Sequence, residues 1–329
     1  MRRLAELLLP ANLATRVPAG TVIVVVAHGA IGLVPFAALE PARLVSAAPA
    51  NGRSARTAVT PLGIRNPIRY APSFAALRAS AQRARVVAMM PRARGAAPQW
   101  SAVRASGQAD KPVLLAQALV VGNPTMPKIY SGRWTTRSQL RSLPGAEAES
   151  RTVATALGAT PLIGSEATES IVRSRMSAAP VIHFATHGLA YGTSSSARRS
   201  YLAFAPDSTR DGLLTLGELM DDATLVLHAE LVVLSACQTG LGDLTRAEGT
   251  IGMQRAFLAK GARSVLVSLW SVDDEATRLL MERFYRHWLD PIAPRSKVEA
   301  LRLAQAEVRA MPKFASPKFW AAFQLVGAE

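Results

Sequence analysis

The sequence has one cysteine, few acidic residues in its first part and no long apolar run. A single cysteine among 329 residues excludes an internal disulfide framework and any metal site built from several thiolates of one chain. No stretch approaches the roughly 18 apolar residues that a membrane-spanning helix needs. The apolar run 4–9 is short, interrupted by Glu6 and ended by Pro10, which argues against a signal peptide. We therefore expect a cytoplasmic protein without a membrane anchor.

The scarcity of acidic residues is confined to the N-terminal part. Residues 1–141 hold 19 Lys and Arg but three Asp and Glu, a net charge of +16, whereas residues 142–329 carry a net charge of −1. Such a charge excess is compatible with a surface for nucleic acid or an acidic partner. The cations are mostly Arg dispersed among Ala, Pro and Gly, and no basic block alternates with aromatic residues, so a solvated basic surface is the simpler interpretation. Nucleic-acid binding through this part stays an alternative.

What the sequence does have is enough apolar residues, 49% of the total, to fill a large core. We divide the chain into a basic N-terminal part, residues 1–141, and a second part, residues 142–329, with sharper patterning. The Ala-, Pro-, Arg- and Gly-rich composition of residues 41–112 is typical of a loop or linker, with one helix predicted over 73–87. A surface loop is predicted at 125–139.

Apolar strands alternate with helices along the chain. Strands are predicted at 21–27, 114–122, 181–186, 201–204, 231–236, 264–270 and 323–326. Helices are predicted from after Pro144-Gly145 to about Leu157, at 167–176, 214–220 and 251–260, from Asp273 or Asp274 to Trp288, and after Ser296. Strands without polar alternation, separated by helices, indicate an α/β fold with a mostly parallel sheet that is covered by helices on both faces.

Two of the predicted strands lead into residues capable of catalysis. Reactive groups in an open parallel sheet lie just beyond the C-terminal strand ends. Strand 181–186 leads to His187 and Gly188, and strand 231–236 leads to Cys237. A free cysteine has a pKa of about 8.5, so it needs a nearby imidazole, which can later protonate a leaving amine. His187 and Cys237 are the candidate catalytic pair, and the backbone N–H groups of Gly188 and Cys237 are candidate oxyanion donors.

The alternatives to this pair stay open at the level of residues. A lone cysteine is more often a small buried hydrophobe than a nucleophile. His28 also follows a predicted strand and is the rival base, although no cysteine accompanies it. His183 lies inside its strand and is predicted to be a hydrogen-bonded core residue, and with no helix or intervening Glu it does not form a zinc motif with His187. We expect no cofactor and no metal.

Several motifs, taken in order, resemble the CHAT-domain family of caspase-like cysteine peptidases. The motifs are Leu33–Leu39, Tyr70–Ser73, Val121–Pro124, Ile182–Gly188, Leu234–Gly240, Gln254–Ala262, Ser268–Asp274 and Phe319–Phe323. The resemblance covers residues 20–329 and implies a caspase-hemoglobinase-like fold. It implies that residues 142–329 form the catalytic domain and that residues 1–141 form a degenerate caspase-like half without a dyad.

The resemblance also implies roles for individual residues and for partners. His187 and Cys237 match the dyad positions, Gly188 and Cys237 match the oxyanion donors, and the substrates of such enzymes are usually proteins. Asp274 matches a frequent acidic position, which either lines a substrate pocket or caps the following helix, and we favour the cap. Because the family often carries helical repeats, we expect an activating protein partner or a helical-repeat regulator.

The expected function is thus a caspase-like cysteine endopeptidase, a thiol protease that cleaves a protein substrate through a Cys–His dyad and an acyl-enzyme. The first alternative is a non-catalytic CHAT-fold scaffold for protein interaction. The others are a basic nucleic-acid-binding module and an acyl transferase that uses the same dyad.

Overall fold

The computed structural model describes most of the chain outside the Arg-rich stretches of the N-terminal part. The described residues are 1–10, 12–26, 29–41, 60–75, 78, 115–131, 136–191, 196–235 and 246–328. Three predictions lie outside these residues: the candidate nucleophile Cys237, the rival base His28 and most of the helix at 73–87. The same holds for much of the basic surface invoked for nucleic acid.

The main sheet has eight strands in the order β1-β2-β13-β12-β11-β7-β3-β6. The strands are β1 (Ile23–Val25), β2 (Ile68–Tyr70), β3 (Leu119–Pro124), β6 (Leu162–Gly164), β7 (Val181–Ala185), β11 (Leu231–Leu234), β12 (Ser264–Ser268) and β13 (Phe323–Gly327). Every neighbouring pair is parallel except β12 and β13. The central strands β7, β11 and β12 are buried along their whole length, which explains their unbroken apolar sequences.

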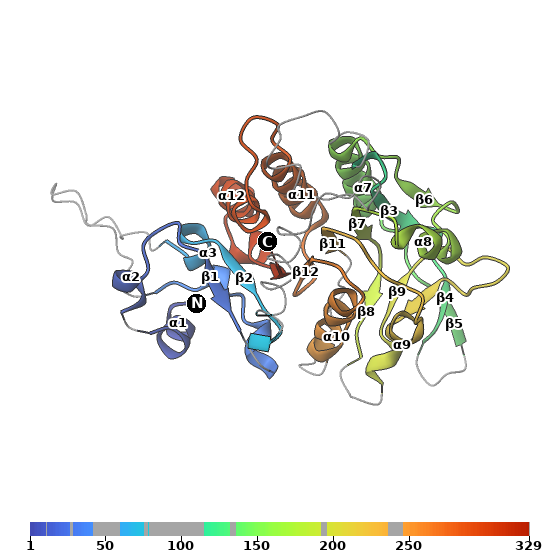
Figure 1. Cartoon of the computed structure of the whole chain (residues 1–329), viewed down its shortest axis with the longest axis horizontal. Coiled ribbons are helices and arrows are strands. Elements are labelled where there is room, and N and C mark those ends of the chain that lie inside the picture. The colour runs from blue at the N-terminus through green and yellow to red at the C-terminus, as the bar shows by residue number, and fades with distance from the viewer. Residues whose placement is uncertain are drawn as a thin grey trace, which may run out of the picture.

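Helices cover both faces of this sheet. On one face, α7 (Pro144–Leu157), α11 (Asp274–Trp288) and α12 (Lys297–Ala310) pack side by side (Figure 1). On the other face lie α8 (Glu169–Met176) and α10 (Arg246–Ala259), as right-handed crossovers between parallel strands require. The predicted α/β class with a mostly parallel sheet and helices on both faces is confirmed. Among the described helices, none has the length and apolar character needed to cross a membrane.

Smaller elements surround this core. The short helices are α1 (Arg2–Leu8), α2 (Leu13–Arg16), α3 (Leu62–Arg65), α9 (Leu216–Asp221) and α13 (Pro317–Trp320), and the 3₁₀ turns are η1 (Gly29–Leu33), η2 (Phe36–Ala38), η3 (Ala197–Arg199) and η4 (Pro312–Phe314). A three-stranded antiparallel sheet contains β8 (Gly188–Leu189), β9 (Tyr201–Ala203) and β10 (Leu213–Thr215). A two-stranded sheet pairs β4 (Lys128–Ser131) with β5 (Thr136–Gln139).

Three local predictions need correction. Residues 125–139 contain the β4–β5 pair instead of a plain loop. The helix predicted from residue 214 begins at Leu216, because Thr215 still pairs in β10 and forms a capping box with Glu218. The strand predicted at 21–27 is the short, half-buried edge strand β1, since it has a described neighbour on one side only.

The main sheet contains strands from both predicted parts of the chain. β3, which belongs to residues 1–141, pairs with β7 of residues 142–329, and β2 pairs with β13. The division at residue 141 and the degenerate caspase-like half stay predictions. What the pairing establishes is that β7, the strand that leads to His187, has a neighbour from the N-terminal part.

Gly122 allows β3 to lie directly against α7. A Cβ at this position would lie 2.1 Å from Ser150 Oγ and 2.7 Å from Ala146 O, and the latter is backbone that cannot swing aside. We expect Gly122→Ala to lower the free energy of unfolding by about 1–3 kcal/mol, as overpacking of a core does. Chemical denaturation measures this change.

The matched control is Gly217→Ala in α9. Its Cβ would meet nothing nearer than Arg198 O at 3.3 Å, and Ala favours a helix over Gly. We expect its free energy of unfolding to stay within about 1 kcal/mol of the wild type. Equal losses for the two variants would contradict the steric explanation.

Candidate active site

The C-terminal ends of β7, β11 and β12 lie next to one another at one edge of the sheet. In the β7–β11 ladder Leu234 lies opposite Phe184, and the next residue, Ser235, donates its N–H to Phe184 O at 3.0 Å. The pairing therefore extends one residue past β11 and brings Ser235 beside the end of β7, where Thr186 and His187 follow. Cys237, two residues after Ser235 in sequence, lies outside the described residues.

His187 is buried and its ring is held by the backbone. It is 4% exposed, and its Nε2 lies 2.7 Å from Arg141 O. Because a carbonyl oxygen can only accept a hydrogen bond, Nε2 carries a proton, and a neutral ring then has its lone pair on Nδ1. The orientation and tautomer of His187 are thus set by the segment that precedes α7. Sequence reasoning missed this partner because it is a main-chain atom 46 residues away.

Asn123, at the end of β3, holds the segment that bears Arg141. Its Oδ1 accepts hydrogen bonds from Leu143 N at 2.7 Å and Ser142 Oγ at 3.1 Å, and its Nδ2 donates to Glu147 Oε2 at 3.2 Å. Hydrogen bonds from Arg151 and Asn123 lower the pKa of Glu147. Asn123 has φ of 45°, a backbone region that Asn tolerates better than most residues. The Val121–Pro124 motif therefore supports His187 through the 141–143 segment.

Gly188 presents its N–H away from the neighbouring strand. Ala203 donates its N–H to His187 O at 2.8 Å, and Gly188 lies opposite Leu202 in the antiparallel β8–β9 pair. Hydrogen-bonded and non-hydrogen-bonded pairs alternate in such a ladder, so Gly188 and Leu202 form the non-hydrogen-bonded pair. The N–H of Gly188 is accordingly turned away from β9.

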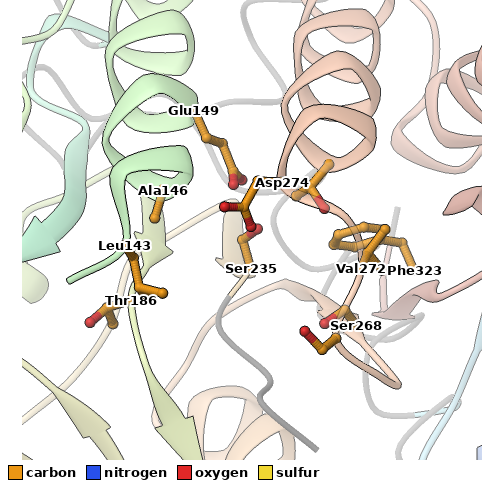
Figure 2. A pocket seen from close by; sticks show the side chains of 11 residues that line it. Leu143, Ala146, Glu149, Thr186, Ser235, Ser268, Val272, Asp274 and Phe323 are labelled. Atoms are coloured by element: carbon orange, nitrogen blue, oxygen red, sulfur yellow. The ribbon is translucent and has the colours of Figure 1, made fainter. Parts of the chain in front are cut away.

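A pocket of about 70 Å³ opens at this edge of the sheet, between the first turns of α7 and α11 (Figure 2). Its lining residues are Leu143, Ala146, Glu149, Thr186, Ser235, Ser268, Ser271, Val272, Asp274, Thr277 and Phe323. Among the lining residues that the structure describes, two are carboxylates and none is a cation. In the part of the chain that the structure describes, no three His, Cys, Asp or Glu side chains gather in a way that would hold a metal ion.

Asp273, not Asp274, caps α11. The Asp273 carboxylate accepts the N–H of Ala276 at 3.1 Å, and Asp274 is the first residue of the helix. The preference for a cap at Asp274 was wrong because a capping side chain must come from the non-helical residue that precedes the first turn. Asp274 lines the pocket instead. Gly145 makes room for it, since a Cβ there would lie 2.2 Å from Asp274 Oδ2 and 2.4 Å from Asp274 Cβ.

Glu149 is a pocket residue that the sequence analysis missed. It lies in α7 on the face that also carries the buried Val153, and its Oε1 is 3.1 Å from His183 Nε2. On its other side, His183 Nδ1 is 3.3 Å from the hydroxyl of Tyr285 in α11. The prediction that His183 is a hydrogen-bonded core residue is confirmed, since it is fully buried. A carboxylate on the apolar face of α7 was the signal that could have identified Glu149.

Burial and nearby carboxylates change the acidity of groups around this site. Burial and the charge of Glu149 raise the pKa of Tyr285 well above 10, so its hydroxyl keeps its proton. Partial burial raises the pKa of Asp274, and the charges of Asp273 and Glu149 raise it further. The pocket therefore holds carboxyl groups that repel one another.

The raised pKa of Asp274 predicts a pH-dependent stability. The folded chain binds this proton more tightly than the unfolded chain does, so stability is lost as pH rises from the ordinary value of 3.8 through the raised pKa. We expect Asp274→Asn to have a higher Tm than the wild type at pH 7, and the difference to vanish at pH values below 3.8. Thermal unfolding across a pH series measures both effects.

The control is Asp290→Asn, for which the expected change in Tm at pH 7 has the opposite sign. The N–H groups of Ala293 and Ile292 lower the pKa of Asp290, so its ionised form stabilises the fold at neutral pH. We expect Asp290→Asn to have a lower Tm than the wild type at pH 7. A lower Tm for Asp274→Asn at pH 7 would contradict the repulsion described for the pocket.

Comparison with known proteins places the chain in a family. A family model described as the CHAT domain matches residues 1–328. Tetratricopeptide repeat protein 28 of Mus musculus is 34% identical over 244 residues, which cover 64% of this chain and 10% of that protein. The Homo sapiens protein of the same name is 33% identical over 247 residues, covering 65% and 9%. The chain thus spans about a tenth of the length of these curated relatives.

Among solved structures, the likenesses concern the fold alone. The separase of the Saccharomyces cerevisiae separase–securin complex is 12% identical with a TM-score of 0.46, covering 82% of this chain and 14% of that chain. The Arg-specific cysteine proteinase gingipain R is 10% identical with a TM-score of 0.46, covering 95% and 78%. The family is established by the match over residues 1–328, which includes the strands, the His187 segment and the pocket described above: the chain belongs to the CHAT domain family.

Proposed function

We propose that this chain is a caspase-like cysteine endopeptidase whose catalytic dyad is His187 and Cys237. The observation that carries the proposal is the β7–β11 ladder, which leads one strand into His187 and the other to Ser235, two residues before Cys237. A chain advances at most about 3.6 Å per residue, so the backbone of Cys237 stays within about 7 Å of Ser235. That reach supports a contact between the thiol and the imidazole.

In the proposed reaction, the Cys237 thiolate attacks the carbonyl carbon of a peptide bond. The N–H groups of Gly188 and Cys237 stabilise the oxyanion of the tetrahedral intermediate. The imidazolium of His187 gives its proton to the leaving amine, the C–N bond breaks, and a thioester acyl-enzyme remains. Water, deprotonated by His187, then hydrolyses the thioester and restores the thiol. The outward N–H of Gly188 supports this assignment.

The Arg141 carbonyl has a defined part in this mechanism. It accepts a hydrogen bond from Nε2–H, with 2.7 Å between Nε2 and the oxygen, and so leaves Nδ1 as the nitrogen that exchanges protons. A carbonyl that accepts this hydrogen bond also stabilises the imidazolium that forms during the reaction. Asn123 keeps that carbonyl in place through Ser142 and Leu143.

The proposal extends to the pocket and to a regulator. Asp274 is proposed to line the pocket that receives a substrate side chain, because the pocket shares Thr186 and Ser235 with the strand ends beside the dyad. The curated relatives are named tetratricopeptide repeat proteins, and the matched part of this chain covers about a tenth of their length. Helical repeats, on a partner or elsewhere in a longer chain, are therefore proposed to activate the peptidase.

The test of the dyad is a proteome-wide cleavage profile of the wild type against Cys237→Ala, together with labelling by a cysteine-directed peptide electrophile. We expect the wild type to create new protein N-termini and to be labelled at Cys237, and we expect the variant to do neither. His187→Ala should lower the cleavage rate about 10²-fold or more, as loss of a general base does.

The matched control is His228→Ala, which removes an exposed histidine just before the start of β11, at the opposite end of that strand from Ser235. Its cleavage profile and labelling should equal those of the wild type. Identical profiles for the wild type and Cys237→Ala, with no labelling in cells that also supply the activating partner, would contradict the peptidase proposal and favour the interaction scaffold.

A further inference from the structure

β8 is an edge strand that begins directly after His187. It pairs with β9 on one side, and in the three-stranded sheet of order β10-β9-β8 no described strand lies on its other side (Figure 1). The main chain of an edge strand carries N–H and C=O groups that no strand of its own sheet engages, so such an edge can pair with another chain. An open sheet edge thus starts at one member of the proposed dyad.

The ladder between β8 and β9 determines which groups face this open edge. Because Ala203 donates its N–H to His187 O at 2.8 Å, these two residues form a hydrogen-bonded pair. Hydrogen-bonded and non-hydrogen-bonded pairs alternate, so Leu189 is the next residue bonded to β9. The N–H and C=O groups of Gly188 and Ala190 therefore point to the open edge. Within the described part of the chain, no hydrogen bond engages the main chain of Ala190.

The segment after β8 continues beside β9 in a fixed position. Tyr191 donates its N–H to the Oγ of the buried Ser200 at 3.0 Å, and Leu216 donates its N–H to Ser200 O at 2.7 Å. The guanidinium group of Arg199 lies 5.2 Å from the centre of the Tyr191 ring, a favourable distance for a cation–π contact. Ala190 is thus held between β8 and a second anchor, so its outward N–H keeps its direction.

Both faces of the three-stranded sheet are covered. Leu202 and Leu214 belong to the main apolar core, and Tyr201 and Ala203 pack with Met126 in a second apolar cluster. A peptide that contacts this sheet therefore meets the edge of β8 instead of a face. An edge that is already ordered loses little conformational freedom when a strand is added to it, which favours binding.

The chemistry of the proposed reaction decides which part of a substrate lies along this edge. His187 protonates the leaving amine, so the substrate residues that follow the cleaved bond begin beside His187. β8 leads away from His187, and a substrate that follows it runs parallel to it. In a parallel ladder, the N–H and C=O of one residue bond to residues two positions apart on the neighbouring strand. Because Gly188 N–H holds the carbonyl before the cleaved bond, Gly188 O faces the N–H of the second residue after that bond.

From these observations we infer that the open edge of β8 is a binding site for the main chain of a protein substrate. The second residue after the cleaved bond donates its N–H to Gly188 O, and its C=O accepts the N–H of Ala190. The position relative to the cleaved bond rests on the proposed peptidase function. Because main-chain atoms alone take part, the site binds extended chains of many sequences and rejects proline at this residue, which has no N–H.

A competing occupant is a second copy of the chain. Edge strands also pair with the same strand of another copy, which engages the outward groups of both. β8 is two residues long, and a stable dimer needs a much larger contact than so short a strand provides. Its place directly after His187 favours a short substrate segment, and the oligomeric state separates the two occupants.

The experiment selects a blocked octapeptide from a pool of random sequences on the immobilised Cys237→Ala chain and measures its affinity by isothermal titration calorimetry. Each amide of the selected peptide is then N-methylated in turn, which removes one N–H donor and keeps every side chain. Among the residues after the bond that the wild type cleaves, we expect methylation of the second to weaken binding at least about fivefold, as loss of a hydrogen bond does. Ala190→Pro in the same background should weaken binding of the unmethylated peptide by a similar factor, since it removes an N–H that β9 does not use.

The matched variant is Ala190→Val, which keeps the N–H and an extended backbone and should restore the affinity to within about twofold. If circular dichroism shows that Ala190→Pro does not fold, the methylation series decides by itself. Equal affinities of the folded Pro and Val variants, a series in which no amide matters, or a pool without a binder would overturn the inference. So would a dimer of the Cys237→Ala chain that Ala190→Pro dissociates in analytical ultracentrifugation.

The outcome is separable from that of the peptidase proposal. One methylation-sensitive amide, together with weaker binding to Ala190→Pro, in a protein whose wild type cleaves nothing would support the edge site and contradict the proteolysis. Cleavage at equal rates of the unmethylated peptide and of the peptide methylated at the second residue after the bond would do the reverse.

Discussion

The parallel pairing of β7 with β11 is the constraint on which the candidate active site depends. Its register places Leu234 opposite Phe184 and extends to Ser235, so two chain segments 50 residues apart reach the same edge of the sheet in step. A slip of one residue would turn every side chain of β11 to the opposite face. Close packing of both buried strands resists such a slip, and a slip of β7 would also separate His183 from its partners Glu149 and Tyr285.

At the C-terminal ends of these strands, backbone groups shape the candidate active site as much as side chains do. Arg141 acts through its carbonyl, Gly188 through its N–H, and Gly145 through the space that its missing Cβ leaves for Asp274. The N-terminal ends of α7 and α11 lie beside the strand ends, as is usual where a sheet of this type binds ligands. A site built in this way tolerates changes of many surface residues but few changes of glycine.

The acidic groups around the pocket lower the stability of the fold at neutral pH. Asp274, Asp273 and Glu149 repel one another, and the raised pKa of Asp274 reports that repulsion. The His183–Tyr285 contact holds Glu149 in this unfavourable position from within the core.

The sequence by itself determined the main strands and helices, because their apolar patterns are uninterrupted. The end of α7 at Leu157 was predicted from Gly158, although its start at Pro144 lies two residues before the predicted one, and β7 and β11 were predicted from buried runs that lead to His187 and Cys237. Only the tertiary structure decided that Asp273 caps α11, that the Arg141 carbonyl holds His187, and that Glu149 joins Asp274 in one pocket. Local patterns cannot show these contacts, because each depends on how helices and loops far apart in the chain pack against the sheet.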